Sequence, residues 1–233
     1  TFAMGQMPGS LQMQNIIPSR ILGTALTVIC SSFLGYMVTQ SELPMRKWVY
    51  RFVVATMYFN AGLIPWYILM VNLGLKNNFL LYILPSAVGA YYVVLSKTYI
   101  ESIPASVEES AKIDGAGVLT IYARLILPMS MPIIACLIVF CAVNQWNAWS
   151  DNFYLVSDPK LSTLQYQLYM NLANESSNVT NTTSSSSLLR SKATTELGLR
   201  YALSMLTVLP ILLVYPFMQK YFVKGIMLGA VKG

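Results

Sequence analysis

The sequence contains no histidine and few charged residues of any kind. Of its 233 residues, 10% are Asp, Glu, Lys or Arg, whereas average soluble domains carry about 25%. A surface of this composition cannot face water on all sides. The missing histidine also argues against a metal hydrolase, because such an enzyme needs His and carboxylate ligands.

Charge is also missing from five long apolar stretches, none of which contains Asp, Glu, His, Lys or Arg. Apolar stretches of about 18 or more residues are long enough to cross a bilayer as helices. A large soluble helical core would instead show polar faces at helical spacing, and these stretches show none. The sequence therefore predicts an all-α integral membrane protein with five spans: Ile21–Val38, Phe52–Val71, Asn77–Ser96, Leu125–Ser150 and Tyr201–Gln219.

The lack of charge inside these stretches limits what the chain can do in a membrane. Ion-coupled transporters, proton pumps and most intramembrane enzymes need titratable groups at membrane depth. The sequence also lacks a GxxxxGK[ST] phosphate loop, so it cannot cradle ATP in that way. If the chain moves a solute uphill, the energy must come from a partner.

Cysteine is scarce, and the chain start carries no secretion signal. Cys30, Cys136 and Cys141 all fall inside apolar stretches, where a thiol behaves as a small hydrophobe. We expect neither a disulfide nor a metal site from them.

The first fifteen residues lack a basic cluster followed by a cleavage site, and because the chain begins with Thr1 we expect it to be cut at its N-terminus.

The net charge of +6 is distributed as in a membrane protein rather than a nucleic-acid-binding protein. Basic residues gather on the cytoplasmic side of membranes. They follow the first, third and fifth stretches, which places the first-to-second loop, the third-to-fourth loop and the C-terminus in the cytosol: Arg46, Lys47, Arg51, Lys97, Lys112, Arg124, Lys220, Lys224 and Lys232.

We interpret residues 1–233 as one transmembrane domain with two longer connections. Residues 101–127 are too polar for the membrane and form a cytosolic loop. Residues 151–200 form an extracytoplasmic loop, which contains the Ser/Thr/Asn-rich run Asn178–Ser187. Such a run is typical of a mobile segment.

The cytosolic loop reads as two short helices with a hinge. Ser102 or Ser106 can cap the first helix, and Ser106 with Glu109 fits a capping box. Glu108 and Lys112 stand in the favourable i, i+4 order. Gly115 permits the left-handed turn that ends the helix. Residues 118–125 then form the second helix, and Pro128 opens the next span.

This loop resembles the EAA loop of binding-protein-dependent ABC importer permeases. Residues 109–116 read Glu-Ser-Ala-Lys-Ile-Asp-Gly-Ala, and Leu-Ile-Leu-Pro follows at 125–128. Ser110 replaces the first Ala of the family pattern. Three further segments look like the carbohydrate-uptake branch, specifically its complex-polysaccharide subgroup: Gly-Leu-Ile-Pro-Trp-Tyr from Gly62, Asn-Gln-Trp-Asn-Ala-Trp from Asn144, and the ending from Tyr221.

The resemblance implies the transmembrane subunit of a type I ABC importer in a prokaryotic cell membrane. Those permeases usually have six spans, so the first is expected to be missing here. The implied partners are a cytosolic ATPase dimer that holds ATP and Mg, a second related permease and an extracytoplasmic solute-binding protein. The implied solute is an oligosaccharide or polysaccharide fragment, and the chain itself carries no cofactor and no catalytic site.

The resemblance also implies which elbow residues meet the ATPase: Glu109, Ala111, Ile113, Asp114, Gly115 and Ala116. Each of these residues can also be explained by a structural role without contact to the ATPase. Glu109 can serve the helix dipole, and Gly115 can be a backbone requirement alone. The small residues can face the lipid-proximal side of the elbow.

Four polar and aromatic residues near the end of the fourth stretch are candidates for the solute pathway: Asn144, Trp146, Asn147 and Trp149. The tryptophans can stack on sugars, but interfacial aromatic belts explain most Trp residues near the end of a span. The asparagines can bind hydroxyls or a neighbouring helix. A permease for a non-sugar solute, and a membrane-embedded enzyme, remain alternatives at this point.

Overall fold

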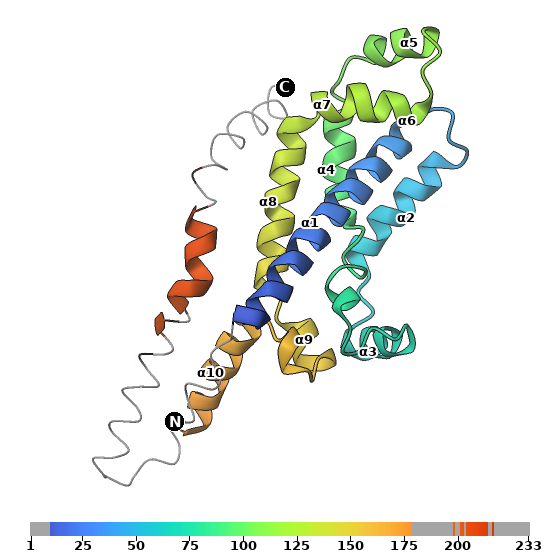
Figure 1. Ribbon diagram of the computed structural model, residues 1–233. Coiled ribbons are helices and arrows are strands. Elements are labelled where there is room, and N and C mark those ends of the chain that lie inside the picture. Colours follow the sequence, from blue (N-terminus) through green and yellow to red (C-terminus); the bar gives the residue numbers. More distant parts are fainter. Residues whose placement is uncertain (1–9, 179–197, 199–200, 203, 214–215, 217–233) are drawn as a thin grey trace, which may run out of the picture.

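The computed structural model describes residues 10–178, 198, 201–202, 204–213 and 216, and this part of the chain contains helices and no β-strand (Figure 1). The predicted all-α class is confirmed. The longer helices are α1 (Ser10–Thr39), α2 (Arg46–Tyr58), α3 (Leu63–Asn72), α4 (Ala90–Ile100), α5 (Ala105–Ile113), α8 (Met131–Asn147) and α10 (Leu164–Asn178). The shorter elements are η2 (Phe79–Tyr82), α6 (Val118–Ile121), η3 (Tyr122–Ile126), α7 (Leu127–Met129), α9 (Ser150–Leu155) and η4 (Pro159–Leu161).

Helix α1 is the central element of the bundle. Among the described residues, its segment Ile17–Thr39 is the one continuous helix long and apolar enough to cross a membrane. It packs against α4 and α8 (Figure 1), and one core cluster joins Val28 to Ile134, Leu137 and Cys141 of α8. The first predicted span is therefore a single helix.

The other apolar stretches are interrupted. Helices α2 and α3 are bent by 118° at their junction, and the helix pair 118–129 and 131–147 is bent by 83°. Counting each bent pair as one span gives up to three spans among the described residues. The third stretch contains the 11-residue α4 preceded by η2 and irregular backbone. Of the fifth stretch, the structure describes the apolar helix Ser204–Leu213.

Local sequence explains the break between α2 and α3. Gly62 has a φ of +84°, a conformation that glycine adopts without steric cost. Its N–H donates to the Asn60 side chain at 2.9 Å, which is an Asx turn. Pro65 then lies in the first turn of α3, where its missing N–H costs nothing.

The second bend lies two residues beyond its predicted position. The sequence predicts that Pro128 opens a span, but residues 118–129 continue as one helix through the π-helical turn η3. Helix α8 begins instead at Met131, after Ser130, and Pro132 occupies its first turn. Pro132 is tolerated because it lies in the first turn of α8, whereas Pro128 closely follows the π-helical turn, in which the regular helical hydrogen bonding is already interrupted.

Polar side chains of α1 satisfy the irregular backbone that precedes α4. The Thr27 hydroxyl donates to the Ser86 carbonyl oxygen at 2.6 Å, and the Gly89 N–H donates to Ser31 Oγ at 3.1 Å. Non-helical backbone inside a membrane protein needs such internal partners. Helix α1 thus combines an apolar exterior with a polar inner face.

The contact between α1 and α4 requires a glycine, which gives the first testable prediction. A Cβ atom at Gly35 would lie 2.7 Å from Ser96 Cβ and 3.1 Å from the Val93 carbonyl oxygen. We therefore expect Gly35→Ala to force the two helices apart, which costs about 1–3 kcal/mol for an overpacked contact. Thermal unfolding of the purified protein in detergent measures this loss.

Gly117→Ala is the matched control, because nothing lies within 4 Å of a Cβ at that position and its φ is −72°. An equal melting temperature for Gly35→Ala and Gly117→Ala would contradict the close approach of α1 and α4.

Candidate functional site

Helices α5 and α6 form the predicted elbow, which projects from one end of the bundle (Figure 1). Helix α5 is amphipathic, and Ala111 is its one buried side chain. The methyl group of Ala111 packs in a core cluster with Tyr36 of α1 and with Ile121 and Tyr122 after the hinge. The elbow therefore rests on the end of α1.

The two ends of α5 test the capping predictions. The predicted serine caps are wrong, since Pro104 precedes the first helical residue without a side-chain cap. The Ser102 hydroxyl donates instead to the Tyr99 carbonyl oxygen at 2.6 Å. The predicted glycine turn is confirmed, because Gly115 has a φ of +80°.

Gly115 ends α5 in a Schellman motif. The Ala116 N–H donates to the Ala111 carbonyl oxygen and the Gly115 N–H donates to the Lys112 carbonyl oxygen, both at 3.0 Å. These are the two bonds that define the motif. The predicted Glu108–Lys112 pair is also formed, with Nζ 3.2 Å from Oε1.

The predicted coupling residues divide between the outside and the inside of the elbow. Glu109, Ile113 and Asp114 are exposed, and Ile113 is 86% exposed. Glu109 and Ile113 are one helical turn apart and share a face. Ala111 is buried, and Ala116 is half-buried against the same core cluster. The elbow surface therefore combines a carboxylate with an exposed isoleucine.

The solute-pathway candidates lie near the opposite end of α8. Asn144 donates to the Tyr92 hydroxyl at 2.6 Å, and Asn147 is exposed. The Trp146 indole donates to the Thr207 carbonyl oxygen at 3.0 Å. The Trp149 ring stacks on Tyr169 of α10 at a centroid distance of 3.9 Å. Both tryptophans thus contact residues of other helices.

Sequence reasoning missed a buried arginine beside these residues. Arg20 is 6% exposed and donates to Gln145 Oε1 at 3.0 Å and to the Ala148 carbonyl oxygen at 3.2 Å. Its guanidinium lies 4.8 Å from the centre of the Tyr82 ring. Arg20 stands one residue before the first charge-free stretch, so in the sequence it looks like a flanking charge. The available signal for a buried polar site was the series of polar residues that follow Arg20 along α1.

Arg20 joins α1 to the end of α8 electrostatically as well as by hydrogen bonds. Ala148 is the C-cap of α8, where a cation offsets the helix dipole and satisfies a free carbonyl. Burial raises the pKa of the nearby Asp151 carboxyl above its ordinary value, and the charge of Arg20 opposes that shift.

A cavity of about 220 Å³ opens next to this network. Apolar residues such as Leu81 and Val88 line part of it, and its polar lining residues are Thr27, Tyr82, Ser86, Tyr92, Asn144, Gln145 and Asp151. Hydroxyl, amide and aromatic groups of this kind suit a polyhydroxylated ligand. Of the four pathway candidates, Asn144 lines the cavity.

Comparison with known proteins identifies the family. The family model described as "Binding-protein-dependent transport system inner membrane component" matches residues 11–228. The polygalacturonan/rhamnogalacturonan transport system permease protein YtcP of Bacillus subtilis (strain 168) is 35% identical over 213 residues, covering 91% of this chain and 73% of that protein. The arabinooligosaccharides transport system permease protein AraQ of the same strain is 26% identical, covering 97% of this chain and 75% of that protein.

The fold has a solved counterpart. A bacterial ABC transporter involved in the import of the acidic polysaccharide alginate contains a chain that superposes with a TM-score of 0.78 at 26% identity, covering 91% of this chain and 74% of that one. The resemblance of the elbow to the EAA loop is thus matched along nearly the whole chain, which belongs to the family of binding-protein-dependent transport system inner membrane components.

Proposed function

We propose that the chain is a permease subunit of an ATP-driven importer that takes up oligosaccharides or polysaccharide fragments across a prokaryotic cell membrane. The observation that carries this proposal is the exposed elbow face of Glu109 and Ile113 in a member of this transport family. The solutes named for its relatives, polygalacturonan, arabinooligosaccharides and alginate, support a carbohydrate.

The energy for transport is proposed to come from a partner. The sequence has no GxxxxGK[ST] loop, so we assign ATP and Mg to a cytosolic ATPase dimer and no catalytic site to this chain. Glu109 offers a carboxylate for an ion pair with that dimer, and Ile113 offers an apolar contact beside it. A second permease completes the pore, and a solute-binding protein delivers the carbohydrate.

The arrangement of the two ends supports the proposed orientation. The elbow lies at one end of the bundle, while α3, α9 and α10 lie at the other (Figure 1). With the elbow in the cytosol, α9 and the described part of residues 151–200 face outside, where they are available to the binding protein. The run Asn178–Ser187 lies, apart from its first residue, outside the described residues, as does the C-terminal tail.

The solute pathway is assigned to the cavity between α1, α4 and α8. Tyr92 and Asn144 present a hydroxyl and an amide to it, and sugars bind through such groups. Trp146 and Trp149 are assigned to helix packing, because they contact other helices and are not among the residues that line this cavity.

The test is uptake by the complex reconstituted in liposomes with its ATPase, partner permease and binding protein. We expect ATP-dependent uptake of labelled oligosaccharides, and a fall of about tenfold or more for Glu109→Ala, since truncating one partner of a desolvated charge pair costs about 2 kcal/mol or more. Glu101→Ala removes another exposed carboxylate near the elbow and should leave uptake unchanged.

Three results would count against the proposal. They are ATP hydrolysis by the isolated chain above a mock preparation, uptake that does not need the ATPase, and wild-type uptake by Glu109→Ala.

A further inference from the structure

Lys112 joins the elbow to a distant part of the chain. Its ammonium lies 3.0 Å from Glu42 Oε1 and 3.2 Å from Glu108 Oε1. It also donates to Gln40 Oε1 at 3.3 Å. Glu108 belongs to α5, whereas Gln40 and Glu42 belong to the connection between α1 and α2. Glu42 precedes Lys112 by 70 residues in the sequence.

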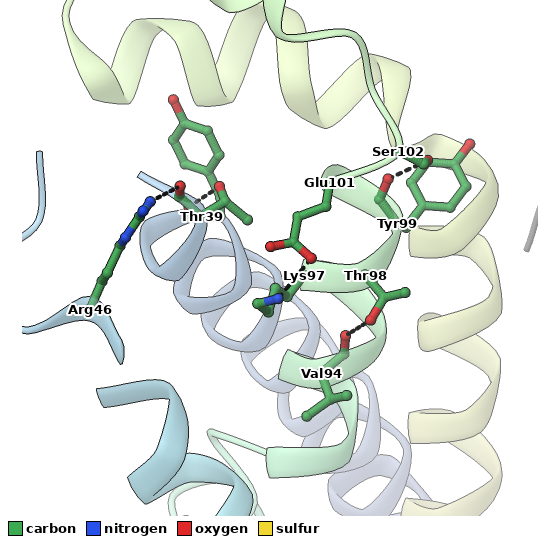
Figure 2. A network of polar contacts seen from close by, with 9 residues as sticks. Thr39, Arg46, Val94, Lys97, Thr98, Tyr99, Glu101 and Ser102 are labelled. Carbon is green, nitrogen blue, oxygen red and sulfur yellow. Dashed lines mark hydrogen bonds and ion pairs between the residues drawn. The ribbon is translucent and has the colours of Figure 1, made fainter. Parts of the chain in front are cut away.

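The α1–α2 connection that receives Lys112 is itself fixed to α1. Gln40 is 4% exposed, and its N–H donates to the Met37 carbonyl oxygen at 3.2 Å. Arg46 donates to the Thr39 carbonyl oxygen at 3.1 Å, at the last residue of α1 (Figure 2). The connection therefore moves with α1 rather than as a free loop.

Helix α5 itself has few other attachments to the bundle, because the core cluster that joins the elbow to α1 is formed mainly by residues after the hinge, such as Ile121 and Tyr122. Ala111 is its one buried side chain in α5, so the apolar contact from this helix consists of a single methyl group. The segments that lead into and out of α5 are exposed around Pro104 and Gly115. The hydrogen bond to Glu42 is the largest cause of the raised pKa of Lys112.

Helix α1 connects the elbow directly to the opposite end of the bundle. The route through α6 and α7 to α8 passes the 83° bend. Helix α1 instead runs without a break from the Lys112 cluster to Arg20, which holds the end of α8 beside the cavity. A movement of the elbow that reaches α1 is therefore carried to the cavity.

We propose that Lys112 is a positioning residue for coupling, which ties the elbow to the α1–α2 connection so that motion of the elbow is transmitted to α1. This inference rests on the proposed function. The ATPase displaces α5 through Glu109 and Ile113 on the outer face of this helix. Lys112 transmits the displacement to α1 through Glu42 and Gln40.

The experiment measures ATP hydrolysed per oligosaccharide imported by the complete reconstituted complex. We expect Lys112→Met to raise this ratio at least about twofold, the lower end of what mutations along a coupling network produce. Glu42→Gln should act in the same direction. The double variant should be no worse than Lys112→Met alone, because both changes break one interaction. Lys112→Arg keeps the charge and should restore most of the coupling.

Glu101→Gln is the matched control. It breaks another lysine–carboxylate pair, Lys97 to Glu101 at 2.7 Å. Both residues of this pair lie at the end of α4, one helical turn apart (Figure 2), and the variant leaves the contact of Lys97 with Tyr50 of α2 in place. Its ratio should equal that of the wild type. Co-purification of the ATPase with each variant reports assembly separately from coupling.

Two results would overturn the inference. One is an unchanged ratio in both Lys112→Met and Glu42→Gln. The other is loss of ATPase co-purification in Lys112→Met while Glu42→Gln behaves as the wild type, which would assign Lys112 to the ATPase surface. Failure of the wild-type complex to import any oligosaccharide would instead reject the proposed function.

Discussion

Replacing Arg20 with methionine is expected to lower the free energy of unfolding by about 3 kcal/mol, because a buried charged donor is lost and its acceptors stay buried. Methionine fills a similar volume but donates no hydrogen bond. Gln145 Oε1 and the Ala148 carbonyl oxygen both lose their donor. The melting temperature of the complex in detergent measures the effect.

The same substitution should show a defined pH dependence. Burial already raises the pKa of Asp151, and Arg20 opposes this shift, so removing Arg20 raises the pKa further. The folded state then binds a proton more tightly than the unfolded state, and stability falls as the pH rises through the folded pKa. We therefore expect the deficit of Arg20→Met to narrow as the pH is lowered toward about 3.9, the ordinary pKa of Asp.

Arg51→Met serves as the control for loss of an arginine. Arg51 is exposed on α2 and lies 5.6 Å from the Trp48 ring centre, so its removal should change stability by about 0.5 kcal/mol or less. If the two methionine variants unfold at the same temperature, Arg20 does not hold α1 to α8.

The elbow could be predicted from sequence because its conformation is local. The Glu108–Lys112 pair is one helical turn apart, and the turn at Gly115 needs a residue that accepts a positive φ. Both features are found. The serine caps failed because Pro104 occupies the position before the first helical residue, and the Ser102 hydroxyl donates to the Tyr99 carbonyl oxygen instead.

The outer site could not be predicted because its partners are distant in sequence. Arg20 and Gln145 are 125 residues apart, and no spacing rule connects them. The same holds for Trp149, whose ring stacks on Tyr169. That tyrosine belongs to α10, a helix within a segment that the sequence indicated only as an outer loop.

The breaks in the apolar stretches mark a third limit of sequence reasoning. Length and composition identify the first stretch, which is one span-length helix, whereas counting bent pairs gives up to three spans among the described residues instead of five. These sequence properties do not show where a helix stops. Gly62 precedes α3 and Ser130 separates α7 from α8, and both have a non-helical backbone conformation. The irregular backbone before α4 is tolerated because Thr27 and Ser31 of another helix bond to it, which only the tertiary structure reveals.

The Gly115→Val variant is expected to lose carbohydrate uptake by about tenfold or more, since strain at a left-handed position costs about 1–3 kcal/mol. Gly115 has a φ of +80°, which a β-branched residue rarely adopts. Relaxing that strain breaks the two Schellman bonds and moves the end of α5. The exposed face of Glu109 and Ile113 then no longer meets the ATPase at the required angle. Uptake and ATPase stimulation in the reconstituted complex measure the loss.

Gly74→Val separates coupling from backbone strain. Gly74 has a φ of +69°, and a Cβ atom placed there, as at Gly115, would meet nothing within 4 Å. Gly74 follows α3, however, at the other end of the bundle (Figure 1). The two valine variants should lose similar stability, whereas only Gly115→Val should hydrolyse more ATP per solute imported. Equal ratios in the two variants would mean that the elbow conformation does not matter for coupling, and Glu109 would then act without a fixed geometry.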